Sequence, residues 1–216
     1  MKVVGLRSAL PAAVLLSLFT GAAGAADQGA PAVSTQELQS KIKYCNSCHQ
    51  PLGQGHRGAT AIPRLAGQQI EYFENQLQAF VERRRYNDYM YRVVHGLSPQ
   101  LRKALATHFR DLNPKPVGGA PGELAAAGRK IYDEGVETAS IPPCASCHGP
   151  EAKGDGMMPR LAGQLYRYTQ KALANWSQER GQDPKKQDTS AIMQPIAHGL
   201  TPAQISAVAA YVSALE

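Results

Sequence analysis

Cys45-Asn46-Ser47-Cys48-His49 recurs 99 positions later as Cys144-Ala145-Ser146-Cys147-His148, and these two pentapeptides contain all four cysteines of the chain. The pattern C-x-x-C-H is typical of covalent c-type haem attachment. Two thiols three positions apart on a helical turn can each bond a vinyl group of one porphyrin, and the next residue places its imidazole at the iron. The sequence therefore predicts two covalently bound haem c groups. The expected attachment residues are Cys45, Cys48, Cys144 and Cys147, and the expected proximal iron ligands are His49 and His148.

A C-x-x-C pair also serves as a disulfide, as half of a zinc site or as a thioredoxin-like redox pair. None of these uses requires a histidine directly after the second cysteine. Zinc would also need a second pair of ligands close by in the sequence, and no cysteine lies between or beyond the two motifs. The pattern therefore favours haem over these alternatives.

Residues 1–26 have the features of a secretory signal peptide. A short basic start with Lys2 and Arg7 precedes an apolar run over residues 9–20, and small residues follow up to Ala25 and Ala26. We expect cleavage near Ala25 or Ala26. An uncleaved membrane anchor is the alternative, but the apolar run is shorter than the roughly 20 residues that span a bilayer. The expected location is the periplasm, with no stable membrane insertion after cleavage.

The chain is an internal duplication. Pro63-Arg64-Leu65-Ala66-Gly67-Gln68 returns unchanged as residues 159–164, and His95-Gly96-Leu97-Ser98-Pro99 returns as residues 198–202 with Thr in place of Ser. The stretch from Asn113 to Gly122, rich in proline and glycine, lies between the copies and is typical of a linker. We expect a first domain over residues 27–117 and a second over residues 118–216.

Hydrophobic spacing predicts an all-α fold in both halves. Ser34 to Glu37 forms a capping box ahead of a helix that leads into Cys45, and Ser98-Pro99 and Thr201-Pro202 open the last helix of each half. Further helices are expected around residues 70–80, 124–131 and 165–176, with an inserted loop over residues 133–143. No convincing alternating strand is present. Because such small domains contain only 6% aromatic residues, we expect haem to supply apolar mass that their cores lack.

Met90 and Met193 are the expected sixth ligands of the two irons. Each lies five residues before the repeated His-Gly-Leu segment, so the two methionines match in position. A thioether favours ferrous iron, raises the reduction potential and closes the coordination site. A buried methionine of the core is the alternative role.

Other side chains compete for the sixth position. Met157 and Met158 have Ala61 and Ile62 as counterparts in the first half, so they do not fit a design shared by both halves. His95 and His198 do recur and are the competing ligands, or else polar groups near the haem edge.

The formal net charge of +6 is unequally distributed. Residues 27–117 hold 12 Lys and Arg against 7 Asp and Glu, whereas residues 118–216 hold 9 against 10. Two haems would add four propionate carboxyls, so the basic composition is a poor argument for nucleic acid, which we do not expect as a partner. Arg83-Arg84-Arg85 is the densest basic cluster and suits either the steering of an acidic partner or a solvated helix end.

These features together resemble the diheme cytochromes c of the cytochrome c4 family. The likeness rests on the two C-x-x-C-H motifs, the two P-R-L-A-G-Q segments, the downstream methionines and the exported start. It implies two class I monohaem cytochrome c domains, joined by a linker and packed about an approximate two-fold axis. It also implies electron transport in a periplasmic respiratory chain, with a terminal oxidase as acceptor and a cytochrome bc1-type complex as donor.

The repeat also suggests what surrounds the ligands. The carbonyl of Pro63 or Pro159 is placed to accept the other ring N–H of the proximal histidine, and the resemblance supports this role. A set of duplicated polar residues suits either haem propionates or surface and capping positions: Arg64, Arg160, Gln68, Gln164, Tyr72 and Tyr168.

An iron held between a histidine and a methionine has no open position for a reactant. The sequence therefore predicts outer-sphere electron transfer and no catalytic residues. Two alternatives stay open. One is a diheme oxidoreductase with one open or displaceable haem ligand, and the other is an electron-entry subunit of a larger complex.

Overall fold

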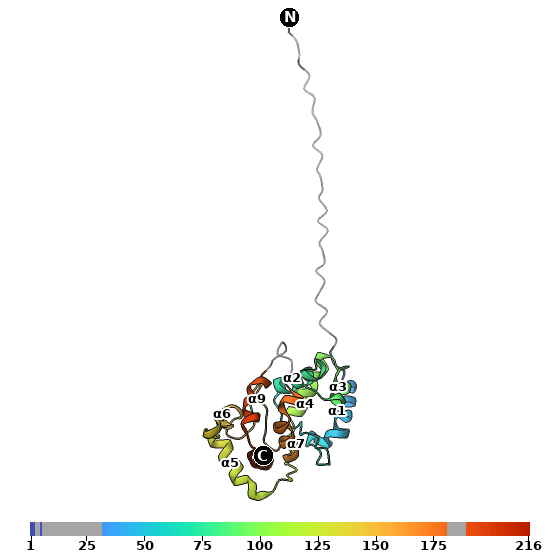
Figure 1. Ribbon diagram of the computed structural model, residues 1–216. Coiled ribbons are helices and arrows are strands. Elements are labelled where there is room, and N and C mark those ends of the chain that lie inside the picture. The colour runs from blue at the N-terminus through green and yellow to red at the C-terminus, as the bar shows by residue number, and fades with distance from the viewer. Residues whose placement is uncertain (3–4, 6–31, 181–188) are drawn as a thin grey trace. The chain divides into compact units, whose positions relative to one another are not determined.

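The computed structural model describes residues 32–180 and 189–216, together with Met1, Lys2 and Gly5 (Figure 1). Residues 32–216 form one unit of helices, turns and loops. The described residues contain isolated β-bridges but no strand, which confirms the all-α prediction. The predicted signal peptide over residues 1–26 lies outside the described part of the chain, apart from three residues. Among the described residues, no helix has the length and apolar character needed to cross a bilayer.

The described part of the first half contains four α-helices and a short 3-10 helix (Figure 1). They are α1 (Thr35–His49), η1 (Pro51–Gly53), α2 (Ile70–Val81), α3 (Asp88–Val94) and α4 (Pro99–Arg110). The Ser34 hydroxyl caps α1 by accepting a hydrogen bond from the Glu37 amide at 3.1 Å. Ser98 caps α4 in the same way, and Pro99 follows at the first helical position. Both helices begin where the sequence predicts, although only the Ser34 bond of the expected capping box is present.

The described part of the second half repeats this order with more breaks. Its elements are η2 (Gly122–Leu124), α5 (Ala125–Glu134), η3 (Glu137–Ala139), α6 (Ala145–His148), α7 (Tyr166–Ala174), α8 (Trp176–Glu179), α9 (Ser190–Gly199) and α10 (Pro202–Ala214). A complete capping box of Thr201 and Gln204 starts α10. The predicted inserted loop begins after Glu134, slightly later than expected, because α5 runs on to that residue.

Each half has its own hydrophobic core. In the first, the buried faces of α2 and α4 meet, and the rings of Phe73 and Phe109 stack with centroids 5.7 Å apart. In the second, Tyr132 of α5 packs with Val208 and Val212 of α10. The stretch from Asn113 to Gly122 lies in sequence between the buried residues of the two cores. The domain limits of 27–117 and 118–216 stay a prediction.

Hydrophobic spacing does not anticipate α3 and α9, and each of these helices carries a predicted haem ligand. α3 spans seven residues, which is too short to show a period, and its start is signalled only by Asn87, whose side chain accepts from the Met90 amide at 3.0 Å. α9 contains Pro195, a residue that normally argues against a helix interior. Tertiary packing on each core therefore decides these segments.

The two C-x-x-C-H motifs are supported differently. α1 runs without a break through the first motif to His49, whereas a loop separates α5 from α6 in the second half. Tyr132 crosses this break. Its side chain is fully buried, and its hydroxyl donates to the Gly149 carbonyl at 2.6 Å, directly after His148. The second motif is thus held to the preceding helix by a hydrogen bond, whereas the first motif is part of α1 itself.

The two halves meet through the repeated glutamines. Oε1 of Gln164 accepts from the Arg64 amide at 2.8 Å, and its Nε2 donates to the Arg64 carbonyl at 3.1 Å. Gln68 makes the same pair of bonds to the amide and carbonyl of Arg160, at 2.8 and 3.2 Å. The contact is reciprocal, as expected for two repeats related by an approximate two-fold axis.

The crossing of α5 and α10 generates a prediction. A Cβ atom on Gly128 would overlap the Ala207 carbonyl oxygen and lie 2.6 Å from its carbonyl carbon. With any larger residue at position 128, the two helices could not lie as close together as they do. We expect Gly128→Ala to lower the free energy of unfolding by about 3 kcal/mol, because overpacking outweighs the better helix propensity of alanine. Far-ultraviolet circular dichroism during chemical denaturation of the full chain measures this. Gly122→Ala is the control, since no atom lies within 4 Å of its Cβ position. Equal stability of the two variants would contradict the prediction.

Candidate haem sites

Each C-x-x-C-H motif forms a helical turn with one half-buried and one exposed cysteine. Cys45 and Cys144 are half-buried, Cys48 and Cys147 are exposed, and none of the four is in a disulfide. This geometry argues against the disulfide alternative. Burial raises the pKa of the Cys45 and Cys144 thiols to about 11. The placement of the two cysteines within each motif is therefore the same in both halves.

The two motif histidines are buried and oriented by a proline carbonyl. Nδ1 of His49 lies 2.8 Å from the Pro63 carbonyl oxygen, and Nδ1 of His148 lies 2.9 Å from that of Pro159. These are the predicted contacts, and the structure confirms them. Because a carbonyl oxygen can only accept, Nδ1 carries the proton and Nε2 keeps a free lone pair.

Burial also favours the neutral form of these imidazoles. It lowers the pKa of His49 and of His148, although the bond to the proline carbonyl acts in the opposite direction. A neutral imidazole with Nδ1 engaged is the form that binds a metal through Nε2. Each histidine is thus fixed in both orientation and tautomer for iron.

Met90 and Met193 lie on α3 and α9, and both are half-buried. Met90 packs against the first core, as does Cys45. Met193 packs against the second core, as does Cys144. Each methionine is therefore placed in the half that its motif occupies, on a helix separate from that motif.

The competing histidines are occupied elsewhere. Nδ1 of His95 lies 3.1 and 3.0 Å from the carbonyl oxygens of Tyr91 and Arg92, and its ring stacks on Tyr91 with centroids 5.4 Å apart. Nε2 of His198 is hydrogen-bonded to the Ser177 hydroxyl. Both histidines are exposed. The two histidines therefore have different partners in the two halves, backbone carbonyls for His95 and a hydroxyl for His198.

Met157 and Met158 occupy a turn that both halves share. A bridge between Asp155 and Met158 mirrors the bridge between His56 and Ile62 in the first half. The bridged segments differ in length, and neither methionine belongs to the hydrophobic core of the described residues.

Arg64 and Arg160 are buried cations with no carboxylate partner among the described residues. They are 4% and 7% exposed, and Nη2 of each donates to the same Asn113 Oδ1, at 3.2 and 3.3 Å. Nη1 of Arg64 is buried with no hydrogen-bond partner, and burial, together with the nearby Arg160, lowers the pKa of Arg64 to about 10. Two buried guanidinium groups require negative charge nearby. Haem propionates are groups of that kind, so these arginines fit the predicted cofactor.

Part of the interface could not be found from the sequence. The side-chain amides of Gln68 and Gln164 each donate a hydrogen bond to a backbone carbonyl of the opposite half. These duplicated residues therefore serve the contact between the halves. Asn113, which joins the two arginines, has no repeated counterpart and lies in the predicted linker. No sequence pattern marks it as a functional residue.

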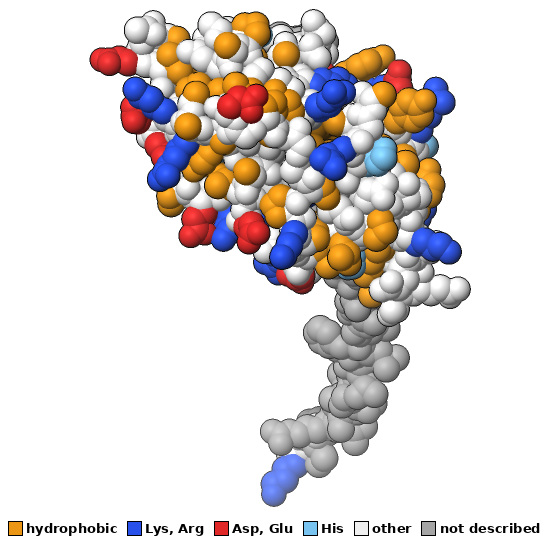
Figure 2. All heavy atoms as spheres, turned by 90° about the horizontal axis from the view of Figure 1, so that it is seen from below, with side chains coloured by type: hydrophobic (Ala, Val, Ile, Leu, Met, Phe, Trp, Pro, Cys, Tyr) orange, Lys and Arg blue, Asp and Glu red, His pale blue; other side chains and the backbone are white. Residues whose placement is uncertain are grey.

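The three residues of the Arg83-Arg84-Arg85 cluster, directly after the end of α2, have different surroundings, and Arg83 is exposed. Arg83 pairs with Asp88 at 2.9 Å, and Arg84 pairs with Glu82 at 2.6 Å. Arg85 reaches into the contact between the halves, where its Nη2 donates to the Tyr168 hydroxyl at 2.6 Å. On the face drawn in Figure 2, Lys and Arg side chains are spread out and not gathered in one patch. Of the three arginines, Arg85 therefore has a structural role in the contact between the halves.

Tyr168 is held by cations from both halves. Burial alone would raise the pKa of its phenol, but Arg85 and Arg180 lower it. Arg180 is 4% exposed, lies over the Trp176 ring at 4.3 Å and has a buried Nη1 without a partner. A second pair of arginines therefore lies where the halves meet.

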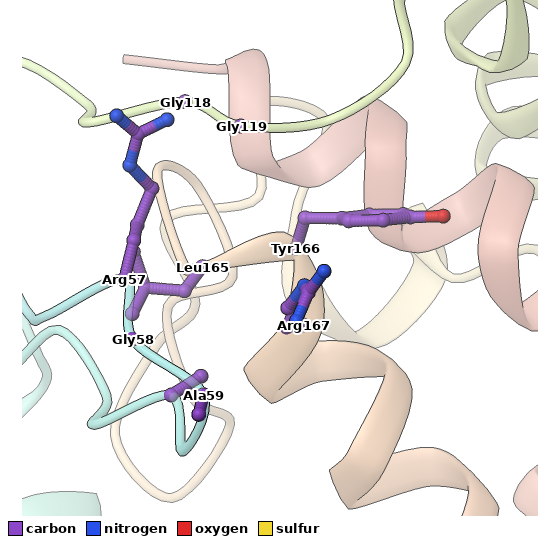
Figure 3. Close-up of a pocket in the computed structure, with 9 residues that line it drawn as sticks. Arg57, Gly58, Ala59, Gly118, Gly119, Leu165, Tyr166 and Arg167 are labelled. Atoms are coloured by element: carbon purple, nitrogen blue, oxygen red, sulfur yellow. The ribbon is translucent and has the colours of Figure 1, made fainter.

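A cavity of about 440 Å³ contains none of the predicted haem residues in its wall (Figure 3). Figure 3 shows the Arg57 side chain reaching from its loop towards Gly118 and Gly119, with Tyr166 and Arg167 at the start of α7. The cavity is thus a feature of the first-half loop, the predicted linker and α7. It is distinct from both C-x-x-C-H sites.

Comparison with known proteins agrees with this geometry. The cytochrome c family model matches residues 125–216. The cytochrome c4 of Thiocapsa roseopersicina is 35% identical over 175 residues, which cover 79% of this chain and 86% of that protein. The thiosulfate dehydrogenase electron acceptor of Thiomonas intermedia is 33% identical over 213 residues, or 97% of this chain and 94% of that protein.

A solved structure gives the same result. Reduced cytochrome c4 from Pseudomonas stutzeri superposes with a TM-score of 0.71 at 29% identity, covering 86% of this chain and all of that one. Fold, paired motifs and relatives agree over most of the sequence. The chain belongs to the cytochrome c4 family, whose members are diheme electron carriers and not enzymes, and it accordingly carries two covalently bound haem c groups.

Proposed function

We propose that each haem has one histidine and one methionine as axial ligands and that the chain carries electrons between periplasmic redox proteins. The ligand pairs are His49 with Met90 and His148 with Met193, and the attachment residues are Cys45, Cys48, Cys144 and Cys147. The observation that carries the proposal is the bond from each histidine Nδ1 to a proline carbonyl at 2.8 and 2.9 Å. It leaves Nε2 as the ring nitrogen available to iron.

The chain's residues suit electron transfer without a reaction at the metal. A bound haem supplies one-electron chemistry by cycling between ferric and ferrous iron. The histidines keep one tautomer because a carbonyl accepts from Nδ1–H, and the thioethers of Met90 and Met193 would favour the ferrous form of a bound iron. Ligands held in this way change little when an electron arrives or leaves.

Arg64 and Arg160 are proposed to hold haem propionates at the contact between the halves. Both are buried, both share Asn113 as a neutral acceptor, and Nη1 of Arg64 has no other partner. A propionate would supply the negative charge that this pair of guanidinium groups requires. The neighbouring glutamines are excluded from this role, because their amides bind main chain of the opposite half.

The proposed place of action is the periplasm, with a terminal oxidase as electron acceptor. The signal-like segment over residues 1–26 supports export. The relative from Thiomonas intermedia is named for accepting electrons from thiosulfate dehydrogenase, which supports a dehydrogenase of that kind as a donor beside a cytochrome bc1-type complex.

The methionine ligands are tested by absorption of the ferric protein in the far red, where sulfur-ligated haem has a weak charge-transfer band. Met90→Leu and Met193→Leu should each remove about half of that band and lower one of the two reduction potentials, because a thioether raises the potential. Met158→Leu is the matched control and should leave the band intact. Full intensity in Met90→Leu, or loss in Met158→Leu, would overturn the assignment.

The role of Arg160 is tested by potentiometric titration. Arg160→Gln removes a buried positive charge, so the ferric state gains stability and the potential of at least one haem should fall. A Coulomb energy of about 1 kcal/mol corresponds to roughly 40 mV for one electron. Arg129→Gln removes an exposed charge from the same half and should leave both potentials unchanged. If Arg160→Gln is folded and both potentials stay at their wild-type values, the propionate role is wrong.

The oxidase proposal predicts that the reduced holoprotein supports oxygen uptake by respiratory membranes. Uptake with the chain as sole electron donor should rise with its concentration and stop when cyanide blocks the oxidase. An oxygen electrode makes the measurement, and boiled membranes serve as control. Membranes that respire with another donor but leave the chain reduced would exclude the oxidase as acceptor.

A further inference from the structure

We infer that Lys41, Tyr44, Tyr89 and Arg92 form a docking surface for a redox partner protein with an acidic contact face. These four residues are called the first rim. The inference rests on the proposed haem ligation, because Tyr44 is adjacent to Cys45 and Tyr89 is adjacent to Met90. A partner bound at the first rim would lie beside the residues proposed to hold the first haem.

Half of the first rim lies on one face of α1. Lys41, Tyr44 and Cys48 are spaced three and four positions apart, so their side chains share a helix face. Tyr44 is 56% exposed. Lys41 is close enough to the Cys45 thiol to act against the effect of burial on its pKa. This face therefore presents an aromatic ring and a cation beside the attachment cysteines.

The other half lies on α3. Tyr89 and Arg92 are one helical turn apart, and Tyr89 is 86% exposed. Asp88, the acid on the same helix, is engaged by Arg83 at 2.9 Å. Arg92 is exposed and forms no ion pair with a described residue. The same combination of exposed tyrosine and cation thus flanks the proposed methionine ligand.

The second half lacks this chemistry at the corresponding positions. Counted from the cysteines, Ser140 and Pro143 replace Lys41 and Tyr44, and counted from the methionines, Ile192 and Pro195 replace Tyr89 and Arg92. Ile192 is 54% exposed, so this second rim is accessible but has neither charge nor an aromatic ring. At these four described positions, the two halves therefore differ in charge and in aromatic character.

Charge complementarity identifies the occupant of the first rim as acidic. The first half has an excess of Lys and Arg, and on the face drawn in Figure 2 most Asp and Glu side chains lie over the side that carries α5 and α6 in Figure 1. Opposite charge accelerates encounter between proteins, and it orients them as they approach. Exposed tyrosines add contact area at low cost in conformational entropy. An acidic partner would thus be directed to the first haem and not to the second.

The test is stopped-flow electron transfer between the reduced holoprotein and oxidised plastocyanin, a small copper protein with a strongly acidic surface. The variant Lys41→Ser with Arg92→Gln should lose roughly tenfold in second-order rate at low salt and approach the wild type at high salt. Lys103→Ser with Lys115→Gln removes the same charge from exposed positions outside the first rim and should change the rate less than twofold. Tyr89→Ile, the residue of the second half, should lower the rate severalfold at every salt concentration.

Equal losses in the two charge variants would overturn the inference, since net charge alone would then explain the rate. So would unchanged rates in both first-rim variants, or a wild type that does not react with plastocyanin although ascorbate reduces it. Sedimentation with phosphatidylglycerol vesicles tests the other partner class: binding that requires Lys41 and Arg92, with plastocyanin rates unchanged, would make the first rim a lipid surface and overturn the inference. A haem count and the far-red band of each sample report separately on the proposed ligation.

Discussion

The hydrogen bond between each motif histidine and a proline carbonyl joins the redox sites to the contact between the two halves. Pro63 accepts from His49, and the next residue, Arg64, is held at its amide and its carbonyl by Gln164. The second half repeats this arrangement. The Pro63 carbonyl, which orients the imidazole, and the Arg64 amide, which binds the opposite half, therefore belong to the same peptide unit. The positions of the imidazoles and the packing of the halves depend on one another.

The two sites differ in the helices that support their C-x-x-C-H motifs. In the first half, α1 is continuous through the motif. In the second, the break between α5 and α6 leaves the motif on a single helical turn, held by the Tyr132 bond to Gly149. Helix continuity cannot be lost without unfolding part of α1, whereas a single hydrogen bond from a hydroxyl can open locally. The supports of the two motifs thus differ although the proposed ligand sets correspond.

Exact repeats predicted local structure well. The capping residues Ser34, Ser98 and Thr201 begin helices as expected, and both proline carbonyls face the motif histidines. Contacts between the halves could not be predicted, because hydrogen bonds between residues about a hundred positions apart produce no local pattern in the sequence. Arg85 shows the difficulty: in sequence it belongs to a basic cluster, yet its partner is Tyr168 of the second half. Short helices such as α3 were missed for a related reason, since packing on the core decides them.

The paired glutamine contact is self-complementary. Gln68 makes the same two hydrogen bonds to the second half that Gln164 makes to the first. Two copies of a single-domain protein could therefore make the same four bonds across a true two-fold axis. Fusion of the two genes would then keep an existing homodimer and make its subunits inseparable. A covalent link of this kind holds the contact in place while the surfaces away from the axis can differ, as Lys41 and Tyr44 differ from Ser140 and Pro143.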